Sequence, residues 1–314
     1  MGTFKLITVI KRHISSLKKK TLTCPLHLTD NDVIDMLWKA LEFKKLYLCY
    51  DYQTKILRKC TLIYLSADSK MNFTIPILKA TKLFGMDLKI ISDSNWFKDN
   101  DLQDVASYLS NFGNIIAYTA KYHTKLQEMI DAFRIPVLCL QDCRYSVADT
   151  LSDIMTFYEQ FGYLTDLKLA WLGPPSSELN TFLHLAPHFG IQVAYCCSCD
   201  PETRTSPSSL FEAKNEFNAT KYIEKSREKL NTDLFKNAKP NWVYLRKLPR
   251  AVKEADDHVF KNFERCITWK SSINNVWIYM SLIMKLLKEY KNVTHKPNFE
   301  NTNSQQRYKV LPKK

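Results

Sequence analysis

The residues of this chain with the clearest capacity for chemistry are its 9 cysteines and its histidines, which could bind a metal ion. His184 and His188 are four positions apart, a spacing that can place two imidazoles on one face of a helix. Pro187 lies between them, however, and the stretch offers no third ligand. The odd number of cysteines also disfavours a disulfide framework. The sequence therefore predicts reduced cysteines that pack as small apolar side chains, with no metal and no other cofactor.

Glycine, which phosphate-binding loops require, is scarce in this sequence. The chain has only 6 glycines in 314 residues, which is about 2% where roughly 7% is usual. No two of them have the spacing of G-x-G-x-x-G or of a Walker loop. P-loop NTPases, kinases and typical dinucleotide enzymes are therefore disfavoured.

The net charge of +13 belongs to the two ends of the chain. Residues 1–20 contain six basic residues and no acid, and residues 285–314 contain eight basic residues and two acids. Each end therefore carries +6, and the remaining 264 residues carry only +1. Nucleic-acid-binding proteins usually carry their basic patch on a folded domain, so we expect no nucleic-acid partner.

No apolar run approaches the roughly 20 residues that a membrane helix needs, so we expect no membrane insertion. Residues 1–16 are basic, contain hydroxyl side chains and lack acids, as is typical of organelle-targeting segments. The sequence therefore favours the mitochondrial matrix. The alternative is a basic tail on a cytoplasmic protein.

Strand and helix patterns alternate along the chain, with short connections between them. Continuous apolar runs predict buried strands at 61–65, 86–91, 114–118 and 135–139, and later at 167–173, 191–195 and 242–245. Helical periodicity predicts helices at 28–41, 73–84, 102–112, 126–133, 149–161 and 179–189. This alternation is typical of parallel α/β sheets, here in two domains.

The predicted domains are 17–150 and 151–274, which follow the basic segment 1–16. A helix over 275–290 returns to the first domain, and 291–314 form a polar, disordered tail.

Several stretches resemble the aspartate/ornithine carbamoyltransferase family, and its mitochondrial ornithine branch most closely. They run in order along the chain and include Arg134-Ile-Pro-Val137 and Leu167-Lys-Leu-Ala-Trp-Leu-Gly173. The resemblance implies the carbamoyltransferase fold: two doubly wound parallel-sheet α/β domains. Only 41 residues separate Asp200 from Trp242, where the family needs further strand–helix units. We therefore expect the second domain to be truncated.

The resemblance also implies where a site would lie. The family binds the phosphate of carbamoyl phosphate with S-T-R-T-R and holds the carbamoyl group with H-P-x-Q. Here these motifs fall on residues 69–73 and 146–149, where both arginines, the histidine and the glutamine are replaced. The implied carbamoyl-phosphate positions are Ser69, Lys70, Met71, Asn72, Thr119, Arg246 and Asn275. The implied amino-acid position is Ser177, and the implied catalytic positions are Ser146, Asp149 and Lys247.

The simultaneous loss of these groups, and of the ornithine motif D-x-x-x-S-M-G, predicts a protein without catalysis. The alternative is an active ornithine carbamoyltransferase that forms citrulline from carbamoyl phosphate and ornithine. Lys70, Arg246, Lys247 and Arg250 could also form a new anion site, or be solvated charges in an abandoned pocket. Because the family works as trimers, the resemblance implies a homotrimer or a mixed trimer with an active paralogue, in a structural or regulatory role. A decaying gene product without a selected role is a third hypothesis.

Overall fold

The computed structural model of the chain describes residues 21–22, 24–50, 55–66, 71–92, 100–120, 122–172, 175–196, 240–248, 257–288 and 290–300. The chain divides into two compact units. Unit 1 comprises Met1–Asp149 and Asn275–Lys296, and unit 2 comprises Thr150–Asn274 and Pro297–Lys314. The chain passes between the units three times, twice inside helices, α7 (Val147–Phe161) and α12 (Thr268–Leu287), and once between residues 296 and 297.

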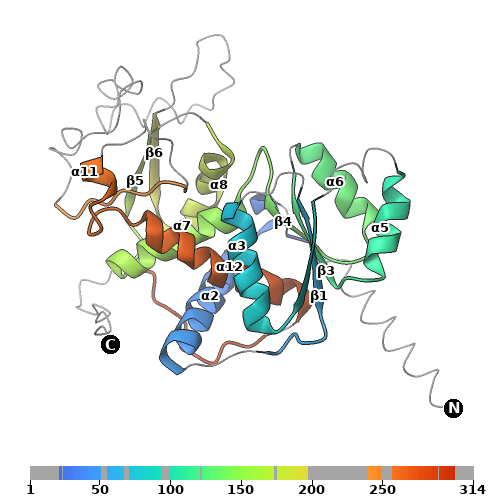
Figure 1. Cartoon of the computed structure of the whole chain (residues 1–314). Coiled ribbons are helices and arrows are strands. Elements are labelled where there is room, and N and C mark those ends of the chain that lie inside the picture. Colours follow the sequence, from blue (N-terminus) through green and yellow to red (C-terminus); the bar gives the residue numbers. More distant parts are fainter. Residues whose placement is uncertain are drawn as a thin grey trace, which may run out of the picture. The chain divides into compact units, whose positions relative to one another are not determined.

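The centre of unit 1 is a parallel sheet whose strands are connected by helices (Figure 1). Its strands are β1 (Thr61–Ser66), β2 (Asp87–Ile91), β3 (Ile115–Thr119) and β4 (Val137–Gln141), in the order β2-β1-β3-β4. From β1, the chain first adds β2 on one side and then β3 and β4 on the other side, so the strand order reverses between β1 and β3. The predicted alternation of strands and helices in a doubly wound parallel sheet is confirmed.

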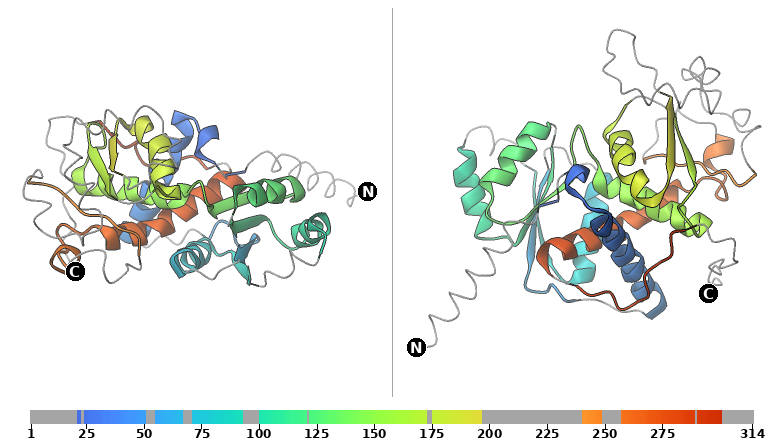
Figure 2. Two further views of the ribbon diagram at one scale, coloured as in Figure 1. Left: turned by 90° about the horizontal axis from the view of Figure 1, so that it is seen from above. Right: turned by 180° about the vertical axis from the view of Figure 1, so that it is seen from behind.

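Helices cover both faces of this sheet (Figures 1 and 2). The helices α5 (Leu102–Ser110) and α6 (His123–Ala132) lie on one face, whereas α2 (Asp30–Tyr50), α3 (Met71–Phe84) and α12 lie on the other. Ile63, Ile116 and Val137 are in register across three strands and belong to the core beneath α5 and α6. Because strand side chains alternate between faces, the neighbouring residue Tyr64 faces the α12 side.

Helix α12 is buried on all sides over residues 274–284, each of which is buried. It begins at Thr268, whereas the sequence predicted a start at 275. The first turns carry few apolar residues, and polar contacts within unit 2 support them: Asn274 Nδ2 lies 2.8 Å from Thr156 Oγ1 and 3.0 Å from Glu159 Oε2. Among the described residues, no helix has the length and apolarity required to cross a membrane.

Polar contacts attach α12 to α2 within unit 1. Ser281 Oγ donates to the carbonyl of Met36 at 2.7 Å, and Lys285 Nζ lies 2.6 Å from Asp32 Oδ1. Burial alone would raise the pKa of Asp32, but hydrogen bonds from Lys285 and Thr29 and the charge of Lys285 lower it to about 2. Asp32 is therefore ionised at neutral pH and pairs with the lysine.

The Glu42 carboxylate, which is 1% exposed, anchors the segment that follows α12. Tyr290 Oη donates to Oε1 at 2.8 Å, and Oε2 accepts from the amides of Val293 and Thr294 and from Thr294 Oγ1. Trp38 Nε1 in turn donates to Thr294 Oγ1 at 3.1 Å. The prediction of a disordered tail is therefore wrong for residues 291–300, because a buried acid on α2 binds this segment.

The described part of unit 2 contains a parallel pair of strands, β5 (Lys168–Leu172) and β6 (Gln192–Cys196). Its shorter helices are α8 (Ser177–Leu185), η2 (Ala186–Phe189) and α11 (Asp257–Phe260). The strand predicted at 242–245 is an isolated bridge between Tyr244 and Cys266. The segment 197–239, on which the predicted truncation depends, lies outside the described residues, so truncation stays a prediction.

We expect Glu42→Ala to lower the free energy of unfolding by about 3 kcal/mol, because it leaves several buried donors without an acceptor. Chemical denaturation followed by tryptophan fluorescence measures the change. Glu264→Gln, at an exposed glutamate, is the matched control and should have no effect. A loss below about 0.5 kcal/mol for Glu42→Ala would show that the carboxylate does not anchor residues 290–294.

Candidate functional site

The carboxyl edge of the unit 1 sheet, where the strand order reverses, is the place where doubly wound proteins bind ligands. Ser66 and Thr119 end β1 and β3 and are in register there. Helix α3 begins close by in the chain, with Met71, which is 70% exposed, and Asn72, which is half-buried. Of the predicted phosphate positions, Thr119 is the last residue of β3, and Met71 and Asn72 are the first residues of α3, the helix after β1. The predicted positions Ser69 and Lys70 lie outside the described residues.

Three predicted site residues meet in one buried cluster of unit 1. Ser146 Oγ donates to Asp149 Oδ2 at 2.9 Å, and Asn275 Nδ2 donates to Asp149 Oδ1 at 3.2 Å. Ser146 precedes α7, Asp149 lies in its first turn, and Asn275 belongs to α12. All three are at most 8% exposed. The positive end of the α7 dipole favours the carboxylate at this position.

This cluster presents a carboxylate where the resemblance expects groups that bind an anionic substrate. Asp149 accepts hydrogen bonds from both of its neighbours, so its oxygens are directed at Ser146 and Asn275. An ionised carboxylate offers only acceptors, and a phosphate dianion is also an acceptor. The arrangement can bind a donor or a cation, but it repels an anion.

The predicted site residues of unit 2 form a second cluster around Glu178. Lys247 Nζ lies 2.7 Å from Glu178 Oε1, and Ser177 Oγ lies 3.1 Å from Glu178 Oε2. The side chain of Arg246 is exposed, and its backbone amide donates to Thr268 Oγ1 at 2.9 Å. The charge of Lys247 is thus directed at a protein carboxylate.

The pKa of Glu178 reports this ion pair. Burial raises the pKa of this carboxyl group, but the charge and hydrogen bond of Lys247 outweigh burial and lower it to about 2. The Glu178 side chain is 15% exposed and that of Lys247 is 35% exposed, so water screens the pair only in part. Glu178 follows a predicted residue directly, but the sequence analysis missed it because its partner is 69 positions away.

A histidine–aspartate pair at the same sheet edge of unit 1 was also missed. His123 opens α6, and its Nδ1 lies 2.5 Å from Oδ2 of Asp142, which follows β4. The other oxygen of Asp142 accepts from the amides of Arg144 and Tyr145. The sequence did contain a signal for this pair. An acid, Asp142, follows one predicted strand closely, and a histidine, His123, lies shortly after the neighbouring predicted strand. Within the described ranges, no group of three or more His, Cys, Asp or Glu side chains could hold a metal.

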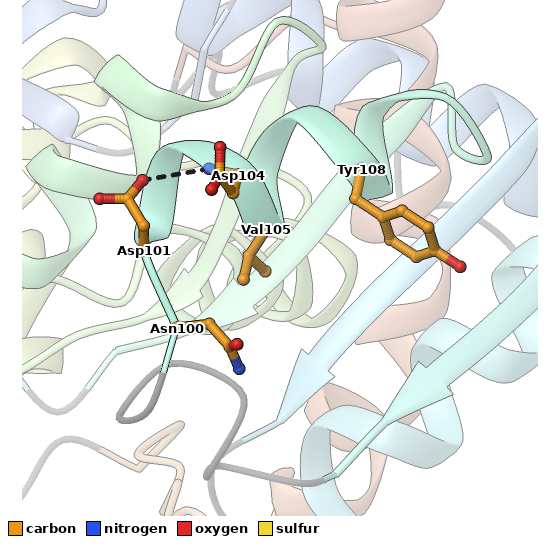
Figure 3. Close-up of a pocket in the computed structure, with 5 residues that line it drawn as sticks. All are labelled: Asn100, Asp101, Asp104, Val105 and Tyr108. Carbon is orange, nitrogen blue, oxygen red and sulfur yellow. Dashed lines mark hydrogen bonds between the residues drawn. The ribbon is translucent and has the colours of Figure 1, made fainter.

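A hollow of about 320 Å³ lies on α5, apart from both clusters (Figure 3). Its lining comprises Asn100, Asp101, Asp104, Val105 and Tyr108, none of which is a predicted site residue. Asp101 Oδ1 accepts from the amides of residues 103 and 104 and so caps the helix. The Asp101 carboxylate therefore serves as the N-cap of α5.

Comparisons with known proteins bear out the fold and the resemblance. No family model matches the chain. It is 24% identical over 238 residues to ornithine carbamoyltransferase, mitochondrial, of Aquarana catesbeiana, a match that covers 64% of this chain and 67% of that protein. It is also 24% identical over 235 residues to ornithine transcarbamylase, mitochondrial, of Gallus gallus, covering 64% of this chain and 66% of that protein.

Solved structures agree with these matches. The ornithine carbamoyltransferase of Thermus thermophilus superposes with a TM-score of 0.74 at 20% identity, covering 85% of this chain and 99% of that one. The enzyme of Pyrococcus furiosus superposes with a TM-score of 0.75 at 16% identity, covering 87% of this chain and 98% of that one. The carbamoyltransferase fold and the predicted resemblance to ornithine carbamoyltransferases are confirmed.

The ion pair of unit 2 leads to a prediction about pH. Because Glu178 has a pKa of about 2 in the folded chain and an ordinary value of 4.5, it stabilises the fold above pH 4.5. This contribution, roughly 2 kcal/mol, should be lost as the pH falls from 4.5 towards 2. Glu178→Gln should remove it, so that unfolding of unit 2 depends less on pH. Thermal unfolding between pH 2.5 and 6 measures the difference, and identical pH profiles for the two proteins would contradict the prediction.

Proposed function

We propose that this chain, a distant relative of the ornithine carbamoyltransferases, has lost carbamoyl transfer and acts as a non-catalytic subunit, structural or regulatory. The observation that carries the proposal is the buried Asp149 carboxylate, held by Ser146 and Asn275. The resemblance places all three at positions that would bind carbamoyl phosphate. Their hydrogen bonds to one another supply the partners that a substrate would otherwise supply.

Electrostatics opposes the substrate at Asp149. Carbamoyl phosphate is a dianion whose phosphate needs cationic or amide donors. Two like unit charges about 4 Å apart repel by about 4 kcal/mol at an effective dielectric of 20. Among the described phosphate positions of unit 1, Met71, Asn72 and Thr119 are uncharged and supply no charge that would offset this repulsion; the charged position among those described, Arg246, belongs to unit 2.

The rival hypothesis of a new anion site is weaker in unit 2. A lysine that binds a free anion needs an ammonium that is available to it, but Lys247 lies 2.7 Å from Glu178. The carboxylate neutralises that charge locally and would repel an incoming anion. The side chain of Arg246 is exposed. The contact of Lys247 with Glu178 therefore favours the hypothesis of an abandoned pocket over that of a new anion site.

An assay for citrulline tests the proposal against the alternative of an active enzyme. We expect the purified protein to form no citrulline from carbamoyl phosphate and ornithine, at a rate at least about 1,000-fold below an ordinary ornithine carbamoyltransferase, because several transition-state contacts are replaced. Asp149→Gln is the matched variant, since it removes the carboxylate and keeps a hydrogen-bonding side chain. Turnover within a few hundred-fold of an ordinary enzyme would contradict the loss of catalysis.

Placement in the mitochondrial matrix is part of the proposal. The basic, acid-free segment 1–16 and the mitochondrial names of the Aquarana and Gallus relatives support it.

An exposed apolar stripe on α3 supports self-association of unit 1. Met71, Ile75 and Leu78 follow one another at helical spacing and are 70%, 58% and 48% exposed. The opposite face of the helix is buried, with Phe73, Ile77 and Phe84 fully covered. A helix with a second apolar face gains stability when another surface covers that face. We propose that this stripe contacts a further copy in a homotrimer, or an active paralogue in a mixed trimer.

A charge on this stripe tests the assembly. Ile75→Glu should shift the protein to the monomer on a sizing column with light scattering, because the contact would then bury a carboxylate. Gln103→Glu, at an exposed position on α5, is the control and should keep the larger species. If Ile75→Glu elutes as an oligomer like the unaltered chain, the α3 stripe is not the contact surface.

A further inference from the structure

Among the buried side-chain atoms of unit 1 that have no protein partner within the described residues, three are oxygens of β1 and α12. They are Tyr64 Oη in β1 and Asn275 Oδ1 and Tyr279 Oη in α12. Both tyrosines are 0% exposed, and Asn275 is 8% exposed. Nearly all buried polar groups in proteins have a hydrogen-bond partner, and leaving one without a partner is unfavourable. Three such oxygens in one unit therefore require an explanation.

The fold brings these oxygens to one side of the sheet. Asn275 and Tyr279 are four residues apart and so lie on the same face of α12. Tyr64 projects from the sheet face that α12 covers, because its neighbours Ile63 and Leu65 belong to the opposite core. The residue in register with Tyr64 on β3 is Ala117, which has a small side chain.

The pKa of Tyr279 is consistent with this placement. Burial raises the pKa of Tyr279 well above its usual value, and the nearby Asp149, Tyr64 and Cys139 raise it further. The orientation of Asn275 is set independently, because its Nδ2 donates to Asp149 Oδ1 at 3.2 Å. The other end of the amide, Oδ1, is consequently turned away from the carboxylate and can only accept.

We propose that Tyr64, Asn275 and Tyr279 bind one internal water molecule in the core of unit 1. The site has two hydroxyls, each able to donate and accept, and one oxygen that can only accept. A water can accept from the two phenols and donate to the amide oxygen, which gives it three partners, the usual number for a buried water. A cation suits this set less well, because none of the three oxygens carries a charge.

The water would join β1 to α12 and hold the Asn275 amide in the orientation that directs Nδ2 at Asp149. It is a structural ligand of the core and does not depend on whether the protein is catalytic. Loss of this water should therefore lower the stability of the fold, in addition to any effect on the Asp149 cluster.

Removing single hydroxyls tests this inference. A buried tyrosine hydroxyl without any partner destabilises the fold, so replacing that tyrosine by phenylalanine would raise the melting temperature. If the hydroxyl instead binds a water, the same replacement lowers the melting temperature. We expect Tyr64→Phe and Tyr279→Phe each to lower the melting temperature by about 2–4 °C. The double variant should lose less than the sum, because both changes remove the same water. Tyr50→Phe, at a tyrosine that is 67% exposed, is the control and should have no effect.

A crystal structure of the full chain completes the test. Density for a water within hydrogen-bond distance of at least two of the three oxygens would support the proposal. Unchanged or raised melting temperatures in the phenylalanine variants, additive losses in the double variant, or absence of that density would overturn it. A melting temperature that rises with potassium in the unaltered protein but not in Tyr279→Phe would also overturn it, in favour of a cation.

Discussion

A buried helix is most stable when its polar side chains find partners inside the protein, and three side chains of α12 do so within unit 1. Ser281 donates to the carbonyl of Met36, and Lys285 pairs with Asp32 at the end nearer solvent. Asn275 donates to Asp149. Each contact fixes the position of another element against the helix. The arrangement of α2, α7 and the sheet thus depends on where the polar side chains of α12 find acceptors.

The same constraint connects the fold to the proposed loss of catalysis. At a position where the resemblance implies an arginine, α12 carries Asn275, and Asp149 faces it from α7. An arginine needs an anion, which the substrate supplies, whereas an amide is satisfied by a carboxylate of the protein. In unit 2, Lys247 and Glu178 likewise satisfy each other. The replaced residues therefore form stable internal contacts without a ligand.

The sheet of unit 1 could be predicted from the sequence because β1, β3 and β4 are rich in consecutive apolar residues and its helices have apolar periodicity. Contacts between distant residues could not be. The hydrogen bonds of Glu42 reach Thr294, 252 positions later, and no local pattern distinguishes this buried acid from an exposed one. Of the candidate site, Ser146, Asp149 and Asn275 were found through the resemblance, but their mutual contacts were not. Glu178 and the pair of His123 and Asp142 were missed because their partners lie on other elements.

The division of the chain into units has a consequence for the order of folding during synthesis. Unit 1 consists of the first 149 residues and of residues 275–296, which the ribosome makes only after almost all of unit 2. Until then its sheet lacks α12, one of the three helices that cover one face, and Glu42 lacks the donors of residues 290–294. The N-terminal unit therefore cannot complete its folding before unit 2 has been synthesised. While unit 2 is being made, the part of the sheet face that α12 covers remains without that helix.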